Sequence, residues 1–173
     1  MRTLVLGGAR SGKSAFGESL LDPRQPVRYA ATARPVDTEM TERIRLHQSR
    51  RPPGWELVEI GADPAPAFAD LPHGAQLLID GLTLWLAGAM ENGHPEKSFD
   101  GLIARMRRVP DLIVVSDEVG GGIIPDNPAA RRFRDLAGEL HQQVAVACDR
   151  VILVTAGLPM VLKGPPLERD PGW

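Results

Sequence analysis

The chain has 173 residues, of which 43% are hydrophobic and 24% charged, and this composition is typical of one globular domain with a substantial core. A formal net charge of −2 offers no electrostatic case for binding nucleic acid or an anionic membrane surface. Cys148 is the only cysteine, which excludes an internal disulfide and favours a reducing compartment. No apolar run approaches the ~20 residues of a membrane helix, and no signal peptide precedes the first predicted strand, so we expect a cytoplasmic protein.

The chain begins with a predicted strand over residues 2–6 and continues into a glycine-rich stretch that fits the P-loop pattern G-x-x-x-x-G-K-[ST]. A helix is predicted directly after it, over residues 13–21, which gives the strand–loop–helix context that a phosphate site needs. Lys13 is predicted to reach the β- and γ-phosphates, and the Ser14 hydroxyl to bind Mg²⁺. The residues predicted to hold a nucleoside triphosphate here are Gly7, Gly8, Ala9, Arg10, Ser11, Gly12, Lys13 and Ser14.

Strand and helix patterns then alternate along the chain, which predicts an α/β fold with a mainly parallel sheet. Further strands are predicted over residues 27–31, 57–60, 76–80, 111–116 and 150–156. Further helices are predicted over residues 38–50, 63–70, 82–92, 98–108 and 128–148. With the P-loop, this pattern indicates a P-loop NTPase-type three-layer domain over residues 1–163, followed by an extended tail over 164–173.

The longest predicted helix has the clearest boundaries. Asn127 is a suitable N-cap and Pro128 suits the first helical position. Apolar residues then recur at helical spacing, from Phe133 through Leu140 to Cys148, so we expect Cys148 to belong to the core.

Two predicted strands end in carboxylates. The strand Leu77–Ile79 is followed by Asp80, which is either a ligand in the magnesium shell or the N-cap of the next helix, and both roles are compatible. The strand 112–116 is followed by Asp117, Glu118 and then three glycines at 120–122. Glu118 is a candidate base towards a substrate hydroxyl or an accessory to the metal shell, and a capped turn is the competing interpretation.

The predicted helix 38–50 carries a histidine between arginines. Glu39, Arg43, His47 and Arg51 are four residues apart and share one face. Arginines suit phosphate oxygens and favour a neutral, nucleophilic imidazole, but the same spacing also describes a solvated face with salt bridges. From spacing alone the solvated face is the stronger interpretation. His73, His94 and His141 lie in loop-like or polar contexts and receive no role.

Several stretches together resemble one family, the bifunctional adenosylcobinamide kinase/adenosylcobinamide-phosphate guanylyltransferases of cobalamin biosynthesis. The stretches are the P-loop GGARSGKS, YAATARPVDTEMTERIRLHQSRRPPGW at 29–55, LLIDGLTLWL at 77–86, VVSDEVGGGIIPDNPAARRFRDLAG at 114–138 and AGLPMVLK at 156–163. The P-loop is generic, whereas the E-M-x-x-R-I-x-x-H helix and the E-V-G-x-G-I-x-P segment are specific to this family. Two positions depart from the family's habit. Asp117 stands where relatives commonly carry Asn, and Gly81 where a larger residue is frequent.

The resemblance implies an enzyme with two activities. It implies phosphorylation of the aminopropanol hydroxyl of adenosylcobinamide by ATP or GTP, and then transfer of GMP from GTP to adenosylcobinamide phosphate with release of pyrophosphate. It further implies Mg²⁺, a histidine–GMP intermediate on His47, and a homotrimer. The positions it places around the nucleotide, besides the P-loop, are Thr32, Ala33, Arg34, Gln48, Ser49, Arg50, Arg51, Glu59 and Asp80.

Two other functions compete with this one. A different P-loop small-molecule kinase would use Lys13 and Asp80 but would not need His47. A nucleotide-dependent switch would need a guanine-reading N-K-x-D motif, and the chain contains no such tetrapeptide.

Overall fold

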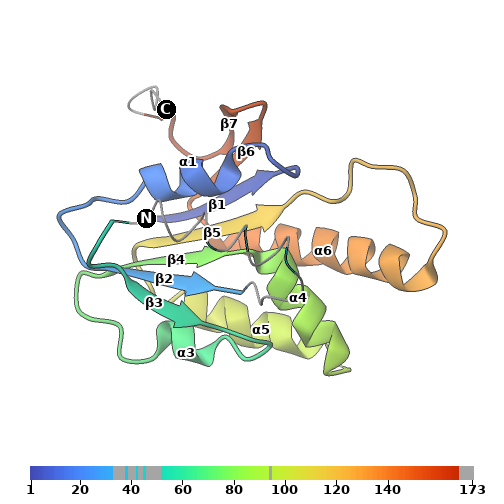
Figure 1. Cartoon of the computed structure of the whole chain (residues 1–173), viewed down its shortest axis with the longest axis horizontal. Coiled ribbons are helices and arrows are strands. Elements are labelled where there is room, and N and C mark those ends of the chain that lie inside the picture. Colours follow the sequence, from blue (N-terminus) through green and yellow to red (C-terminus); the bar gives the residue numbers. More distant parts are fainter. Residues whose placement is uncertain (33–37, 39–41, 43–44, 46–51, 94, 168–173) are drawn as a thin grey trace.

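The computed structural model describes residues 1–32, 38, 42, 45, 52–93 and 95–167. Its centre is a seven-stranded sheet with the strand order β3-β2-β4-β5-β1-β6-β7, parallel except for β7 (Figure 1). The strands are β1 (Arg2–Gly7), β2 (Val27–Ala31), β3 (Glu56–Glu59), β4 (Gln76–Asp80), β5 (Leu112–Asp117), β6 (Arg150–Thr155) and β7 (Leu158–Lys163). The central strands are buried on both faces, which is why they read as continuous apolar runs.

Helices cover both faces of this sheet, which confirms the predicted three-layer α/β fold (Figure 1). One face packs against α1 (Lys13–Ser19) around a core that includes Val5, Phe16 and Tyr29. The other face carries the larger core, built around Trp85 and Phe99. Its helices are α3 (Ala65–Phe68), α4 (Leu82–Glu91), α5 (Pro95–Met106) and α6 (Pro128–Ala147).

The predicted elements among the described residues are present, with boundaries that differ by a few residues. The largest differences are α5, which begins three residues before the predicted 98, and α3, which is a single turn inside the predicted 63–70. The end signals of α6 behave as expected, because the Asn127 side chain accepts hydrogen bonds from the backbone N–H groups of Ala129 and Ala130. Cys148 is buried, and burial raises the pKa of its thiol to about 12, so it is a core residue as predicted.

Strand β7 was not predicted. It runs antiparallel to β6 after a tight turn in which Ala156 and Gly157 both have positive φ. Alanine in a left-handed conformation is not a usual turn signal, and Pro159 argues against a strand except at an edge, which is where β7 lies. Its exposed positions Leu158, Met160 and Leu162 are apolar. The sequence therefore lacks the alternation of apolar and polar residues that marks a half-buried strand.

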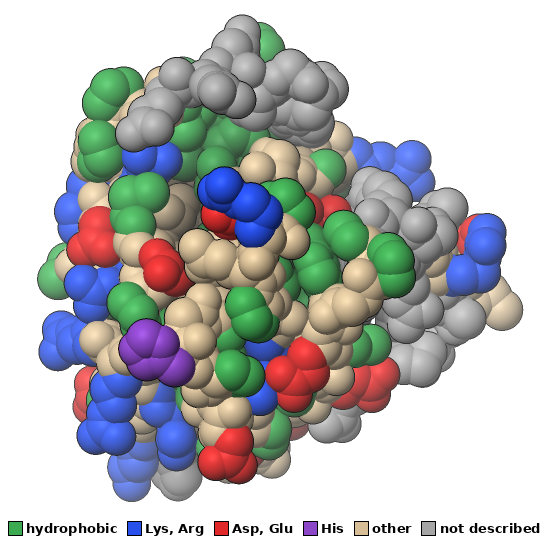
Figure 2. Space-filling view, turned by 90° about the vertical axis from the view of Figure 1, so that its left-hand side faces the viewer, with side chains coloured by type: hydrophobic (Ala, Val, Ile, Leu, Met, Phe, Trp, Pro, Cys, Tyr) green, Lys and Arg blue, Asp and Glu red, His purple; other side chains and the backbone are tan. Residues whose placement is uncertain are grey.

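The surface at the amino ends of the strands carries acidic and basic side chains side by side, in keeping with the nearly balanced net charge (Figure 2). Within the described part of the chain, no helix combines the length and the apolar character needed to cross a bilayer. The features that concern function lie at the opposite, carboxyl edge of the sheet.

Candidate active site

The P-loop follows β1 and turns sharply into α1. Gly12 has φ 93° at the N-cap of α1, a conformation that favours glycine. Gly7 is required by close packing, since a Cβ there would lie 2.3 Å from Ser11 Oγ and 2.7 Å from the Val154 carbonyl oxygen. The loop is held by hydrogen bonds from Ser11 N–H to the Gly8 carbonyl at 3.2 Å and from Gly157 N–H to the Ser11 carbonyl at 3.0 Å. These contacts preform a loop of the kind that surrounds phosphates.

Neither packing nor a positive φ requires glycine at position 8. A Cβ at Gly8 would meet nothing within 4 Å, and its φ is not positive. The left-handed residue in this part of the loop is Arg10, with φ 56°. The turn therefore depends on Gly7 and Gly12, while Gly8 leaves open space beside the loop.

Ser14 and Asp80 lie together although they are far apart in the sequence. Ser14 Oγ, on the first turn of α1, donates a hydrogen bond to Asp80 Oδ1 at 3.2 Å, and Tyr29 OH donates to Asp80 Oδ2. Gly81, not Asp80, is the N-cap of α4, and it makes no side-chain cap hydrogen bond. The capping role weighed for Asp80 is thus wrong, whereas a hydroxyl and a carboxylate oxygen side by side fit the oxygen ligands that Mg²⁺ prefers.

Thr32 follows β2 and contacts the end of the neighbouring strand β4. Its hydroxyl lies 2.9 Å from the Asp80 carbonyl oxygen and 2.6 Å from that of Gly81. Gly81 has φ 93°, and a Cβ there would lie 2.5 Å from Thr32 Oγ1. The absence of a side chain at Gly81 therefore leaves room for the Thr32 hydroxyl.

Lys13, in the P-loop, forms an ion pair with Asp117 at the end of β5. Its Nζ lies 2.5 Å from Asp117 Oδ1 and donates to the Gly8 carbonyl at 3.2 Å. Asp117 Oδ2 in turn accepts a hydrogen bond from the Thr83 hydroxyl at 2.9 Å. β5 pairs with β1 so that Asp117 lies beside Gly7, and this register places the carboxylate next to the lysine. The charge that Asp117 adds relative to an asparagine thus faces the P-loop lysine.

Glu59 lies on the same row of the sheet as Asp80. The registers pair Glu59 with Ala31 and Ala31 with Asp80, so the backbones of Glu59 and Asp80 are two strands apart, about 10 Å. Both point to the face that carries α1, because Ile60 and Val58 pack into the core on the opposite face. The structure thus brings Glu59, Asp80 and the P-loop to one face at the carboxyl edge.

Glu118 follows at the end of β5. Its backbone N–H donates to the Gly7 carbonyl at 2.9 Å, and its Oε1 accepts from the Gly120 N–H at 2.5 Å, so the capped turn is present. Its Oε2 lies 4.0 Å from His141 Nδ1, and His141 Nε2 lies 2.7 Å from Ser116 Oγ. Arg134, two turns before His141 on the same face of α6, donates to the Gly120 carbonyl and so also holds this loop.

His141, which received no role from the sequence, is buried and has polar partners around it. It is buried on α6, only 8% exposed, and bonded to a serine that is itself fully buried. Burial lowers the pKa of the imidazole, and the nearby carboxylates of Glu118 and Asp117 oppose that shift only in part. The signal that was missed is positional, because His141 follows Ala137 by four residues and Leu140 by one within the apolar stripe of α6.

This burial predicts a pH dependence of stability. A histidine whose pKa is lowered on folding binds fewer protons in the folded than in the unfolded state, so the free energy of unfolding falls as pH drops below about 6.5. Between pH 8 and pH 5.5, we expect the wild type to lose more unfolding free energy than His141→Gln in urea titrations. His73→Gln, in an exposed turn, is the control for loss of a histidine, and equal losses in wild type and His141→Gln would contradict the prediction.

Several predicted site residues lie outside the described part of the chain: Ala33, Arg34, His47, Gln48, Ser49, Arg50 and Arg51, together with most of the predicted helix 38–50. Among the residues that are described, no group of three or more His, Cys, Asp or Glu is arranged to hold a metal ion. The candidate magnesium position is the Ser14–Asp80 pair, where phosphate oxygens and water would complete the shell.

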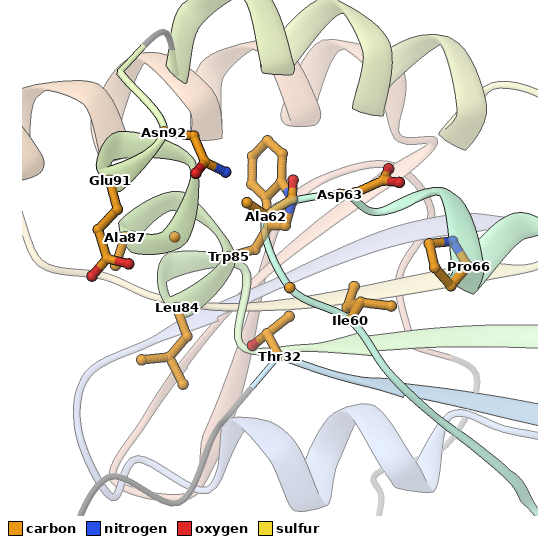
Figure 3. A pocket seen from close by; sticks show the side chains of 12 residues that line it. Thr32, Ile60, Ala62, Asp63, Pro66, Leu84, Trp85, Ala87, Glu91 and Asn92 are labelled. Carbon is orange, nitrogen blue, oxygen red and sulfur yellow. The ribbon is translucent and has the colours of Figure 1, made fainter.

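A hollow of about 690 Å³ opens beside the site, between α4 and the segment that joins β3 to α3 (Figure 3). Thr32, Ile60 and Trp85 contribute to its wall, and no sequence signal pointed to it. A volume of this size falls within the range of small-molecule binding sites.

Two solved structures have a similar fold over most of this chain. The flagellar accessory protein FlaH from Methanocaldococcus jannaschii matches 94% of this chain and 77% of its own, with a TM-score of 0.52 and 14% identity. The type III secretion ATPase EscN from enteropathogenic E. coli, solved with its central stalk EscO, matches 90% of this chain and 42% of its own, with a TM-score of 0.56 and 15% identity. At these identities the likeness concerns the fold alone.

Sequence relatives are much closer. The bifunctional adenosylcobalamin biosynthesis protein CobP of Pseudomonas aeruginosa is 43% identical over 177 aligned positions, covering 96% of this chain and all of the relative. The bifunctional adenosylcobalamin biosynthesis protein CobU of Salmonella typhimurium is 38% identical and covers 94% of this chain and all of the relative. The profile of the family "Cobinamide kinase / cobinamide phosphate guanyltransferase" matches residues 3–162. The chain therefore belongs to the cobinamide kinase/cobinamide phosphate guanyltransferase family.

Proposed function

We propose that this enzyme phosphorylates adenosylcobinamide with ATP or GTP and then transfers GMP from GTP to adenosylcobinamide phosphate, giving adenosylcobinamide-GDP and pyrophosphate. The observation that carries the proposal is the family match over residues 3–162 of a chain whose P-loop brings Ser14 within 3.2 Å of Asp80. Family and site thus point to the same chemistry, transfer from a bound nucleoside triphosphate.

In the kinase step the substrate hydroxyl oxygen forms a bond to the γ-phosphorus while the bond from that phosphorus to the β–γ bridging oxygen breaks. Lys13 exchanges its contact with Asp117 for the phosphate oxygens, and the P-loop N–H groups hold the triphosphate in line. Glu118, fixed beside Gly7, is proposed to accept the hydroxyl proton. Mg²⁺ held by Ser14 and Asp80 would neutralise charge on the triphosphate oxygens.

In the guanylyl step His47 is proposed as the nucleophile. Its imidazole nitrogen forms a bond to the α-phosphorus of GTP, pyrophosphate leaves, and the phosphate of adenosylcobinamide phosphate then takes the GMP group from the histidine. The proposed nucleotide contacts are the P-loop with Thr32, Ala33, Arg34, Gln48, Ser49, Arg50, Arg51, Glu59 and Asp80. The kinase step uses the γ-phosphorus and the guanylyl step the α-phosphorus. The position of the nucleotide relative to His47 must therefore differ between the two steps.

Covalent labelling tests the proposal. Wild-type protein incubated with Mg²⁺ and GTP labelled at the α-phosphorus is expected to retain label after denaturation, in a form stable to base and lost in acid, as a phosphoramidate should be. His47→Ala is expected to take no label yet still to transfer the γ-phosphate to adenosylcobinamide. Wild-type protein that transferred the γ-phosphate but took no α-label would instead be a P-loop kinase without guanylyl transfer, the alternative function.

The proposal includes a cytoplasmic location, which the single cysteine favours. It also includes a homo-oligomer, a trimer by resemblance to the family, and an extended tail after a domain that spans residues 1–163. Leu167 packs against the core around α1, so the tail begins in contact with the domain.

A further inference from the structure

We propose that the hollow between α4 and the β3–α3 segment is the subsite for the corrin ring of the acceptor substrate, and this inference rests on the proposed function. The hollow measures about 690 Å³, and its wall includes Asn92 and the Trp85 ring, whose Nε1 donates a hydrogen bond to the Ala62 carbonyl at 3.0 Å (Figure 3). A second hollow of about 310 Å³ shares the residues Ala62, Asp63 and Asn92 and extends along α5 to Arg105. The two hollows, together called the trough, share part of their walls and suit a ligand much larger than a nucleobase.

The trough lies on the opposite face of the sheet from the nucleotide carboxylates. Ile60 and Trp85, in its wall, belong to the core beneath α4, whereas Asp80 and Glu59 point to the face of α1. The two faces meet at Thr32, which lines the trough and whose hydroxyl contacts the Asp80 and Gly81 carbonyls at 2.9 and 2.6 Å. A ring seated in the trough would therefore contact Thr32, which itself contacts the backbone of the proposed magnesium ligand Asp80. A flexible arm on the ring would need only to cross the sheet edge at Thr32 to reach the nucleotide.

The lining matches a corrinoid better than a phosphate. The larger hollow has an apolar floor with Leu84 at its edge, and its charged groups are the carboxylates of Asp63 and Glu91; neither Lys nor Arg lines it among the described residues. Carboxylates repel a phosphate but accept hydrogen bonds from amide N–H groups. A corrin ring presents apolar methyl groups and primary amides around its rim, and an alkylated cobalt(III) corrin carries a net positive charge. The Asn92 amide supplies both a donor and an acceptor for the same groups.

Gly88 offers a way to fill the trough without touching the nucleotide site. It lines the larger hollow on α4, and a Cβ there would make only ordinary contacts, the nearest 3.6 Å from Ala62 N. Leucine at this position fits the helix and projects a side chain into the space. Gly138, an exposed glycine of α6 with nothing within 4 Å of a Cβ, is the matched control.

The test measures dissociation constants for adenosylcobinamide and for GTP separately by calorimetry. Gly88→Leu is expected to weaken adenosylcobinamide binding by at least about tenfold, while Gly138→Leu stays within about twofold of wild type and GTP binding is unchanged in both. A second variant changes a surface charge and does not add volume to the trough. Glu91→Lys, at the exposed end of α4, is expected to weaken adenosylcobinamide binding by about fivefold or more. Glu139→Lys on α6 is its control.

The outcomes separate the inference from the function. Unchanged adenosylcobinamide binding in both trough variants, with the wild type still phosphorylating that substrate, would overturn the subsite and leave the proposed function intact. Loss of GTP binding instead of adenosylcobinamide binding would assign the trough to the guanine base and likewise overturn the inference. Wild-type protein that neither bound nor phosphorylated adenosylcobinamide would overturn both.

Discussion

Replacing Lys13 by alanine is expected to slow phosphorylation of adenosylcobinamide by about 10²–10³-fold, since a positioned charge that stabilises the transferring phosphoryl group typically contributes that much. The described structure shows the ammonium already at the P-loop, bonded to the Gly8 carbonyl at 3.2 Å and to Asp117 at 2.5 Å. The measurement is the initial rate of transfer from γ-labelled GTP at saturating adenosylcobinamide.

Asp117→Asn is the matched control for Lys13→Ala. It removes the ion pair but leaves the ammonium in place, and the amide oxygen still accepts from the Thr83 hydroxyl. We expect this variant to keep a rate within about fivefold of wild type, because a partly exposed ion pair contributes about 1 kcal/mol or less. If Lys13→Ala were no slower than Asp117→Asn, the lysine would serve the loop's structure and not the transferring phosphate.

Replacing Asp80 by asparagine is expected to lower kcat/KM by about 10²–10³-fold and to raise the Mg²⁺ concentration needed for half-maximal rate. Asparagine keeps the size of the side chain but removes the negative charge that faces Ser14 Oγ at 3.2 Å. The measurement is a Mg²⁺ titration of the kinase rate in both proteins.

Tyr29→Phe distinguishes the charge of Asp80 from its orientation. It removes the phenol that donates to Asp80 Oδ2 while the carboxylate stays. We expect its Mg²⁺ requirement to lie much closer to wild type than that of Asp80→Asn. An Asp80→Asn variant with an unaltered Mg²⁺ requirement would show that the carboxylate does not belong to the metal shell.

The sequence by itself determined the P-loop, the α/β alternation and the family. These features are local or nearly so: a contiguous phosphate-binding motif, strands recognisable as apolar runs, and a helix begun by Asn127 and Pro128. Asp80 was also identified, because it ends a buried strand in a chain that already contains a P-loop. The sequence left open whether it caps a helix, since an aspartate before a helix is common in both roles.

Only the tertiary structure decided which distant residues meet. The strand order places β5 between β1 and β4, so α1 crosses over β5 to set Ser14 against Asp80, while Asp117 on β5 meets Lys13. The Ser14–Asp80 contact agrees with the magnesium shell that the sequence predicted for both residues. The Lys13–Asp117 contact has no sequence signal, because the register between strands far apart in the chain depends on the packing of the whole sheet. The burial of His141 beneath Ser116 and the edge strand β7 have the same origin. The trough beside α4 is likewise a product of packing, formed where helices and loops remote in the sequence leave space between them.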